Sequence, residues 1–381
     1  MDKSSMQIIV FFAMVVFVAV YVTITNNKRK QNAIINKLKN GWGKPAQRKY
    51  TGDDYECISH YFKRNANENS IDDITWNDLG MDDIFRMMNN TNSSAGQEYL
   101  YRMLRQPDAD MESLKKLDRL ATAIDKNASK RLELQKIFVW IGRAKHISIS
   151  DYCDVVVGLD KKSNALHYAS LLFLVAAIVF TCVINPVIGI WLCIAAVAFS
   201  IITYYKFKAG VDRYFICVNH IVKLLMGAGK ITALNVDFLE EYNIKLKNIT
   251  EDLSDIMKRS WLLETGNVDG SIMEMALDYL RMLTHADLIK FNNLIKLFHD
   301  KEKRIYELID TLGFIESSIA IASFRNMLDA WCIPEFKNDS DMQLEVKNVY
   351  HPLIKKPVAN SISTKHNVLL TGSNASGKST F

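Results

Sequence analysis

The sequence NVLLTGSNASGKSTF, residues 367–381, decides how the C-terminal part of the chain is interpreted. Residues 372–379 match the pattern G-x-x-x-x-G-K-[ST] in full. The apolar run Val368-Leu369-Leu370 in front of them is typical of a buried parallel strand, and the small residues that follow let the backbone turn tightly around an anion. The stretch therefore predicts a phosphate-binding loop at a strand-to-helix junction.

Each residue type in this loop suits phosphate binding for a separate chemical reason. Gly372 and Gly377 allow a close backbone approach, so that successive N–H groups point at phosphate oxygens. Lys378 would place its charge between the β- and γ-phosphates of a nucleotide, and the Ser379 hydroxyl would reach Mg²⁺. Thr380 would open a helix whose N-terminal dipole adds to the attraction.

Length, charge and cysteines narrow the class of protein. The chain has 381 residues, enough for two or three folding units, and a net charge of +5. Eight basic residues and no acidic one lie between Asn26 and Gly52, which leaves the rest of the chain at about −3. The six cysteines form no C-x-x-C pair and have no histidine at ligand spacing. We therefore expect free thiols in a reducing compartment and no metal site built from cysteine.

Residues 8–24 contain no charged side chain and consist mainly of Ile, Val, Phe and Ala. With its flanks, such a run approaches the ~30 Å thickness of the hydrocarbon core of a bilayer. A signal peptide is the alternative, but its apolar region usually has only ~7–15 residues and its basic residues come first. The sequence therefore predicts an uncleaved membrane anchor.

The basic residues between Lys28 and Lys49 follow this anchor, which places them on the cytoplasmic side by the positive-inside rule. Four residues within the cluster fall at helical spacing: Ile34, Ile35, Leu38 and Trp42. They predict a short amphipathic helix that lies on anionic lipid headgroups. Nucleic acid is the alternative partner for this charge.

A second apolar block, residues 166–205, has no charged residue and is interrupted by Asn185-Pro186, a turn signal. Each half is about long enough for one membrane span, and lysines flank both ends of the block. It therefore predicts a transmembrane hairpin with its turn outside and its flanks inside. A buried helical pair of a soluble core is the alternative. With the N-terminal anchor, the hairpin gives three crossings and a multi-pass protein of the cytoplasmic membrane, with its soluble domains in the cytoplasm.

The remaining sequence is helical until about residue 335. Apolar residues recur at intervals of three and four over 99–104, 114–124, 211–225 and 305–319. Ser94 and Gln97 have the spacing of a capping box, Pro107 would end that helix, and Asp110 would cap the next. Residues 342–346 alternate between apolar and polar, as a half-exposed strand does.

Two stretches resemble the MutS family of mismatch-repair ATPases. The first runs from Ile74-Thr75-Trp76 through residues 90–97 to Pro107, and is similar to the start of that family's helical core, with a strand-like entry and a Thr- and Gly-containing helix start. The second covers residues 322–381. It resembles the family's passage from a lever helix through Glu345 and His351-Pro352 into Thr371–Thr380.

The resemblance implies binding of ATP with Mg²⁺, a homodimer in the full-length form, and levers that enclose DNA. Ser379 would be the Mg²⁺ ligand, and we assign no catalytic residue. The residues that would bind ATP are Gly372, Ser373, Asn374, Ala375, Ser376, Gly377, Lys378, Ser379 and Thr380.

The chain also departs from that family's pattern. Mismatch-reading members insert a Phe-x-Glu wedge from a domain that precedes the helical core, whereas Phe314-Ile315-Glu316 and Phe238-Leu239-Glu240 lie late in helical stretches and match by chance. The hairpin lies where the family has only helices or a DNA clamp. No acidic strand end follows the loop, so we expect a C-terminally truncated product that does not hydrolyse ATP by itself.

The predicted fold is mainly α: a helical core and lever domain with one N-terminal transmembrane helix and an inserted transmembrane hairpin, followed by the start of an α/β P-loop ATPase domain. The predicted segments are an anchor (1–27), a basic juxtamembrane segment (28–70), the first part of the core (71–165), the hairpin (166–205), the second part (206–334) and the start of the ATPase domain (335–381).

Three functions follow from these features. The first is a membrane-anchored MutS-like ATP-binding protein related to mismatch repair. The second is a membrane scaffold whose nucleotide site is regulatory or vestigial. The third is a transport-type ATPase, against which the absence of charged residues inside the spans argues.

Overall fold

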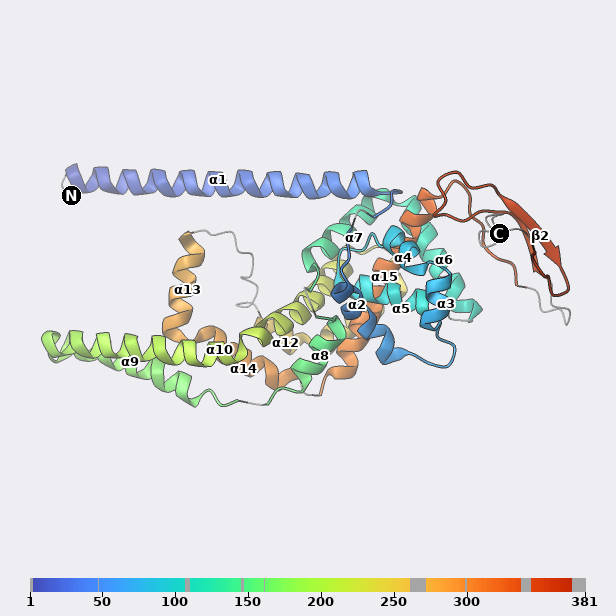
Figure 1. Cartoon of the computed structure of the whole chain (residues 1–381). Helices are drawn as coiled ribbons and strands as arrows, with labels where there is room; N and C mark the ends of the chain where they lie inside the picture. Colours follow the sequence, from blue (N-terminus) through green and yellow to red (C-terminus); the bar gives the residue numbers. More distant parts are fainter. Residues whose placement is uncertain are drawn as a thin grey trace.

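The computed structural model describes residues 3–46, 48–106, 110–144, 147–160, 162–260, 272–298, 300–336 and 344–371. Over these residues the chain is mainly helical, as the sequence predicts, with one two-stranded sheet near the C-terminus (Figure 1). The helices of the body are α2 (Gly52–Asn65), α3 (Asp73–Asp78), α4 (Met81–Met88), α5 (Ser94–Arg105), α6 (Met111–Lys126), α7 (Ala128–Ile141), α8 (Ile149–Val157), η1 (Asp237–Leu239), α11 (Glu240–Asp252), α12 (Ser254–Ser260), α14 (Ala286–Phe298) and α15 (Glu302–Met327).

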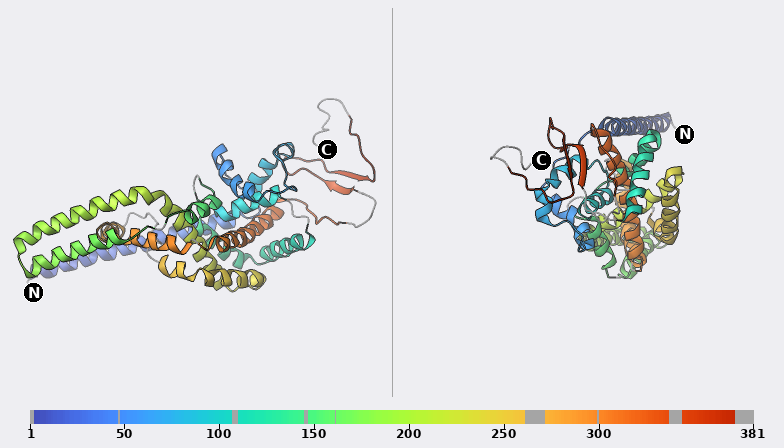
Figure 2. Two further views of the ribbon diagram at one scale, coloured as in Figure 1. Left: turned by 90° about the horizontal axis from the view of Figure 1, so that it is seen from below. Right: turned by 90° about the vertical axis from the view of Figure 1, so that its right-hand side faces the viewer.

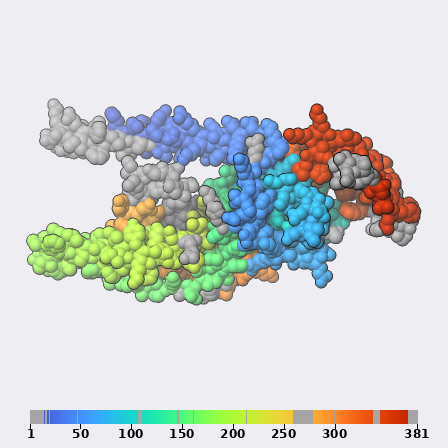
Figure 3. Space-filling view, viewed as in Figure 1, coloured from blue at the N-terminus to red at the C-terminus, as the bar shows by residue number. Residues whose placement is uncertain are grey.

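Four further helices extend from the body on the side opposite to the sheet. They are α1 (Lys3–Gly41), α9 (Ala165–Val183), α10 (Pro186–Ala233) and α13 (Ile272–Thr284). Figures 1 and 2 place the N-terminus and the turn between α9 and α10 at one end of the molecule, and the β-hairpin at the other. In the space-filling view, α1 and the α9–α10 pair form two separate arms that leave the same side of the body (Figure 3).

The main core lies where α15 and the C-terminal half of α10 pack among the shorter helices. Leu134, Phe138, Leu225, Leu308 and Ile315 are all fully or almost fully buried there. Each apolar side chain of this size contributes roughly 1.5–3 kcal/mol on burial. The apolar stripes predicted over 211–225 and 305–319 therefore form the centre of the body.

The observed helix caps agree with the predicted ones, except that one cap lies one residue earlier than predicted. The side chain of Asp110 accepts hydrogen bonds from the backbone of Glu112 and Ser113, which confirms it as the cap of α6. The cap of α5 is Ser93, whose hydroxyl accepts from the Gly96 N–H, and not the predicted Ser94. The Ser94 hydroxyl instead accepts from the backbone of the segment after α7.

The strand-like entry expected at residues 74–80 is wrong, because Asp73–Asp78 is helix α3. The carboxylate of Asp72 accepts from the Thr75 N–H and starts this helix. Trp76 is buried against Tyr101, and its indole N–H donates to the Asp82 carboxylate at 2.8 Å. This packing of one aromatic side chain favours a helical turn over an extended segment.

A separate amphipathic helix after the anchor is also a wrong prediction, because α1 continues without a break to Gly41. No proline or glycine occurs between residue 24 and that glycine, so the sequence offers no reason to stop earlier. Its half-buried apolar residues face the body: Arg131 of α7 lies 3.5 Å from the Trp42 ring centroid, in a cation–π contact. The apolar face predicted to lie on lipid therefore anchors α1 on protein.

The sheet consists of β1 (Leu344–Val349) and β2 (Asn360–Thr364), which pair antiparallel. Leu344 lies opposite Thr364, and the register shifts between Val346 and Val349. Within the described residues, the predicted strand is confirmed from residue 344 onward, but its side chains are mostly exposed and not half-buried.

Candidate functional site

The predicted nucleotide-binding residues, Gly372–Thr380, lie outside the described residues, and so does Ser379 as the predicted Mg²⁺ ligand. Their arrangement therefore stays a prediction from the sequence. The structure does describe the segment that leads to them, up to Thr371.

This approach segment differs from its prediction. Val368, Leu369 and Leu370 form no strand, and they are 57%, 88% and 46% exposed. An apolar run becomes a buried parallel strand only when neighbouring strands flank it and helices cover both faces. The described part of the chain supplies only the antiparallel β1–β2 pair, so the buried parallel strand expected before the loop is not formed here.

The β-hairpin is linked to the helical body through the exit of α15. The Tyr350 hydroxyl donates to the Ala330 carbonyl oxygen at 3.0 Å and accepts from the Ala330 N–H at 3.3 Å. Arg325, in the last turn of α15, lies over the Trp331 ring at 4.5 Å. These contacts attach the sheet to the segment that follows α15.

Helix α5, which belongs to the first stretch that carries the MutS resemblance, packs closely on α15. A Cβ at Gly96 would overlap the Glu316 carboxylate, and a Cβ at Gly313 would lie 2.6 Å from the Tyr99 Cβ. Both glycines therefore permit a close approach that no larger residue would allow without movement. The α5–α15 junction is defined here as Gly96, Tyr99, Gly313 and Glu316.

Glu316 belongs to α15, and its buried carboxylate contacts the start of α5. It accepts hydrogen bonds from the backbone N–H groups of Asn92 and Ser93 and from the Ser93 hydroxyl. Burial raises the pKa of Glu316 to about 7, and these hydrogen bonds act in the opposite direction. A carboxylate at this position satisfies the free N–H groups of the helix start and favours its positive dipole end.

Glu98, in α5, accepts hydrogen bonds from the start of α8 in the same way. Its carboxylate accepts from the Ile149 N–H at 2.8 Å and from the Ser148 hydroxyl at 2.5 Å. Burial raises the pKa of Glu98 to about 8, and the bonds from Ser148 and Ile149 lower it in part. The two glutamates thus tie α5, α8 and α15 together through helix starts.

Thr91, in the stretch 90–97, is another buried residue with several hydrogen bonds. Its carbonyl oxygen accepts from the guanidinium groups of Arg48 and Arg143, the latter at 2.6 Å, and its hydroxyl donates to Asn89 at 2.6 Å. No local pattern pointed to Glu98 or Arg143, Arg48 was predicted only as part of the basic cluster near lipid, and Glu316 appeared only within a chance match. Their partners are distant in the chain, so no local spacing points to them.

Among the residues that the structure describes, three helical segments are by length and composition able to cross a membrane: Ala165–Val183, Pro186–Asp212 and Tyr214–Ala233. Only 17% and 22% of the first two are buried, whereas 56% of the third is buried. The third segment forms the centre of the core through Val218, Ile221 and Leu225, so we assign it to the body. The first two form the predicted helical hairpin, broken at Asn185-Pro186.

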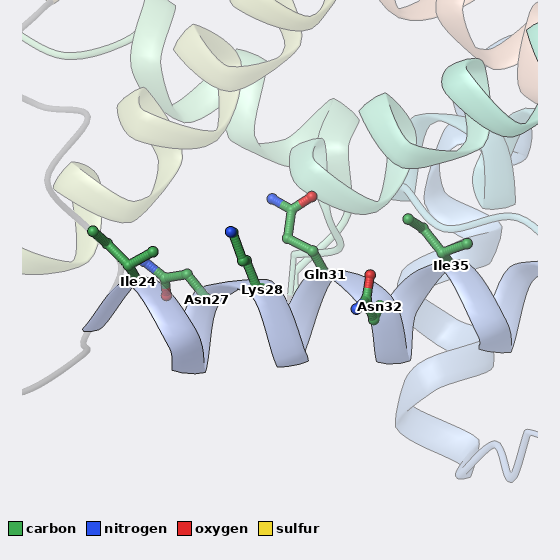
Figure 4. Close-up of a pocket in the computed structure, with 6 residues that line it drawn as sticks. All are labelled: Ile24, Asn27, Lys28, Gln31, Asn32 and Ile35. Atoms are coloured by element: carbon green, nitrogen blue, oxygen red, sulfur yellow. The ribbon is translucent and has the colours of Figure 1, made fainter. Parts of the chain in front are cut away.

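Helix α1 carries the predicted anchor at residues 8–24. Among its described side chains, Phe17, Tyr21 and Ile24 are 72%, 62% and 49% exposed. Further along α1, an open, shallow groove is lined by Ile24, Asn27, Lys28, Gln31, Asn32 and Ile35. Figure 4 shows Lys28 and Gln31 projecting from α1 toward the helices of the body. The groove marks the change from apolar to basic sequence along one helix.

The base of the hairpin contains a buried polar network. His285 Nε2–H donates to the Ser200 carbonyl oxygen at 2.9 Å, and the Nδ1 atoms of His285 and His167 share a hydrogen bond of 3.0 Å. The Tyr204 hydroxyl donates to the Asp287 carboxylate at 2.8 Å and accepts from the Lys208 ammonium at 2.7 Å. The network joins α9 and α10 to the junction between α13 and α14.

In the ranges that the structure describes, no cluster of three or more His, Cys, Asp or Glu side chains is placed to hold a metal ion. The six cysteines are free thiols. Comparison with protein-family models, with curated proteins and with solved structures found no match to this chain.

Proposed function

We propose that the chain is a membrane-anchored, MutS-like protein that binds ATP with Mg²⁺ through Gly372–Thr380. The observation that carries the proposal is the complete G-x-x-x-x-G-K-S pattern after an apolar run and a strand-forming segment. A contact between the two resembling stretches, in which the Asn90 amide donates to the Ser323 hydroxyl at 3.4 Å, supports a common architecture for them.

In this proposal the backbone N–H groups from Gly372 to Gly377 surround the phosphates. Lys378 contacts the β- and γ-phosphates as a point charge, and Ser379 supplies a hydroxyl ligand to Mg²⁺. The lever helix α15 would connect this loop with the body through the exit contacts of Ala330 and Tyr350.

Nucleotide binding to the chain in lipid nanodiscs tests the proposal. A fluorescent ATP analogue is titrated with and without Mg²⁺ on the wild type and on Lys378→Ala. We expect Mg²⁺-dependent binding that weakens at least about tenfold in the variant, since charge-assisted contacts to phosphate are worth roughly 1.5–3 kcal/mol.

Lys356→Ala is the matched control, because Lys356 is an exposed lysine of the segment between the strands. The control should bind like the wild type. Equal binding by the wild type and Lys378→Ala, or no binding by either, would refute the proposed site.

We further propose that α1 and the α9–α10 hairpin cross the bilayer, with the body on the cytoplasmic side. The exposed apolar surfaces of both arms and the lysines at the base of the hairpin support this orientation. In intact cells, a membrane-impermeant maleimide should label Ile184→Cys at the hairpin turn, in a background without Cys182 and Cys193. It should label native Cys332 only after permeabilisation, and the reverse pattern would exclude the orientation.

DNA and a second copy of the chain are partners that the resemblance alone suggests. Binding of DNA through lysines and arginines would weaken steeply with salt, because counterions are released from the phosphates. A filter-binding assay with branched and mismatched DNA between low and physiological salt measures this slope. Absence of binding at low salt would remove DNA from the proposal.

A membrane scaffold is the second candidate function. The exposure of Val368, Leu369 and Leu370 outside any sheet favours it, because a nucleotide loop normally follows a buried strand. Under this alternative the nucleotide site is regulatory or vestigial, and the body and hairpin serve for protein contacts. Absence of nucleotide binding in the nanodisc titration would favour the vestigial form of this alternative.

A further inference from the structure

Helix α13 packs at a defined depth along the hairpin. The Ser200 hydroxyl donates to the Leu283 carbonyl oxygen at 2.8 Å, and Met282 packs against the main core. Ser200 lies about 21 Å from Pro186 at the turn, and Tyr204 about 27 Å, at 1.5 Å per residue. The hydrocarbon core of a bilayer is ~30 Å thick, so α13 meets the hairpin close to the boundary nearer the body.

The hairpin is polar at this depth, and the junction of α13 with α14 covers the polar groups. His167, Ser200 and His285 are 2%, 0% and 1% exposed and are hydrogen-bonded to one another. Within hydrocarbon, a polar group without a partner costs several kcal/mol. The same contacts fix α13 beside the hairpin.

The direction of α13 differs from that of the two arms. Figure 1 shows α13 crossing the direction of α1 and of the hairpin, and Figure 2 shows it end-on in the view from below. Tyr279 and Leu280 are 61% and 56% exposed, while Arg281 and Asp278 form an ion pair at 2.8 Å. An exposed tyrosine beside an exposed leucine and a paired charge is typical of the membrane–water boundary.

We propose that α13 lies in the plane of the bilayer, at the boundary between headgroups and acyl chains nearer the body, with Tyr279 and Leu280 in contact with lipid. The proposal rests on the membrane insertion of the hairpin proposed above. The partner is the lipid itself: Tyr279 and Leu280 are exposed, and α13 packs against α9 and α10, which also expose apolar side chains.

Site-directed spin labelling tests this placement. The chain is reconstituted in phosphatidylcholine–phosphatidylglycerol vesicles after Cys57, Cys182, Cys193 and Cys332 are replaced by alanine. A nitroxide is attached at Tyr279→Cys, and its collisions with oxygen and with a water-soluble nickel chelate are measured. Two matched positions on exposed helix surfaces are Leu172→Cys on α9 and Ile244→Cys on α11, which are 70% and 59% exposed in the native chain.

The ratio of oxygen to nickel accessibility should be highest at position 172, intermediate at 279 and lowest at 244. Nickel collisions at 279 should be several-fold fewer than at 244. A water-exposed label at 279, with a lipid-exposed label at 172, would refute the placement of α13 and leave the hairpin inserted. A label at 279 shielded from both reagents would also refute it, because the residue would then contact protein. A water-exposed label at 172 would overturn the insertion of the hairpin and this inference together.

Discussion

At the scale of single residues, Gly96 decides how closely α5 and α15 approach. A methyl group at this position would overlap the buried Glu316 carboxylate. We predict that Gly96→Ala destabilises the chain by about 1–3 kcal/mol, the usual cost of overpacking, although alanine favours a helix more than glycine does. The midpoint of thermal unfolding in detergent should fall.

Gly229→Ala is the matched control for this change. Gly229 also lies inside a helix, α10, but a Cβ there would meet nothing within 4 Å. Alanine should be neutral or stabilise by up to about 1 kcal/mol. A Gly96→Ala variant as stable as Gly229→Ala would show that α5 and α15 do not approach as described.

The buried carboxyl groups of Glu98 and Glu316 give the stability a dependence on pH. Burial raises their pKa to about 8 and about 7, from a reference of 4.5. The folded chain therefore binds more protons than the unfolded chain over this window. The resulting stabilisation is complete below about pH 4.5 and is lost as the pH rises through 7 and 8.

Glu98→Gln combined with Glu316→Gln keeps similar side-chain shapes without these titrations. As the pH rises from 6 to 9, the wild type should lose stability and the double variant should not. The difference in free energy of unfolding should grow by at most about 1.4 kcal/mol per pH unit for each glutamate. Unfolding midpoints measured over this range supply the comparison. Glu251→Gln, a change on the exposed surface of α11, should parallel the wild type, and a parallel double variant would contradict the assignment.

Local signals predicted some residues well. Asp110 caps α6 because its partners are its own neighbours in the sequence. Glu316 bonds to Ser93, 223 residues away, so its role depends on how α15 packs on α5 and no spacing could reveal it. The Ser93 cap was missed by one residue, because the adjacent serine also offers a hydroxyl.

At the scale of elements, the β1–β2 hairpin is the least supported part of the described chain. A two-stranded hairpin is at best marginally stable in water unless other elements cover it. Most residues of β1 are exposed, whereas α15 is buried along most of its length.

We predict that the amides of Leu344–Val349 exchange hydrogen for deuterium orders of magnitude faster than those of the buried part of α15. Exchange followed by mass spectrometry measures both segments in one sample. Equal protection in strands and helix would mean that a larger sheet covers the hairpin in solution.

Secondary structure was predicted correctly where a single stretch of sequence determines it. The break at Asn185-Pro186 is such a case, since proline opens α10 and the Asn185 side chain caps it. The run 368–370 is the opposite case, because its burial requires neighbouring strands. The apolar face near Trp42 was assigned to lipid because the sequence does not indicate that α7 lies beside it.

At the scale of the whole molecule, the two exposed apolar arms leave one side of a helical body, and the β1–β2 hairpin and the segment after it leave the other (Figure 1). Sequence predicted the helical class and the hairpin, because long uncharged apolar runs carry those signals by themselves. It could not predict that α13 crosses between the arms, since that direction depends on packing around Ser200 and His285.

The central claim is a membrane-anchored chain whose nucleotide loop faces the cytoplasm. Its most direct test is the binding of radiolabelled MgATP, which does not cross membranes, to sealed vesicles of opposite orientation that contain the wild type or Lys378→Ala. We predict binding that depends on Lys378 in inside-out vesicles and none in right-side-out vesicles. Binding that is the same with and without Lys378, or that occurs in right-side-out vesicles, would contradict the claim.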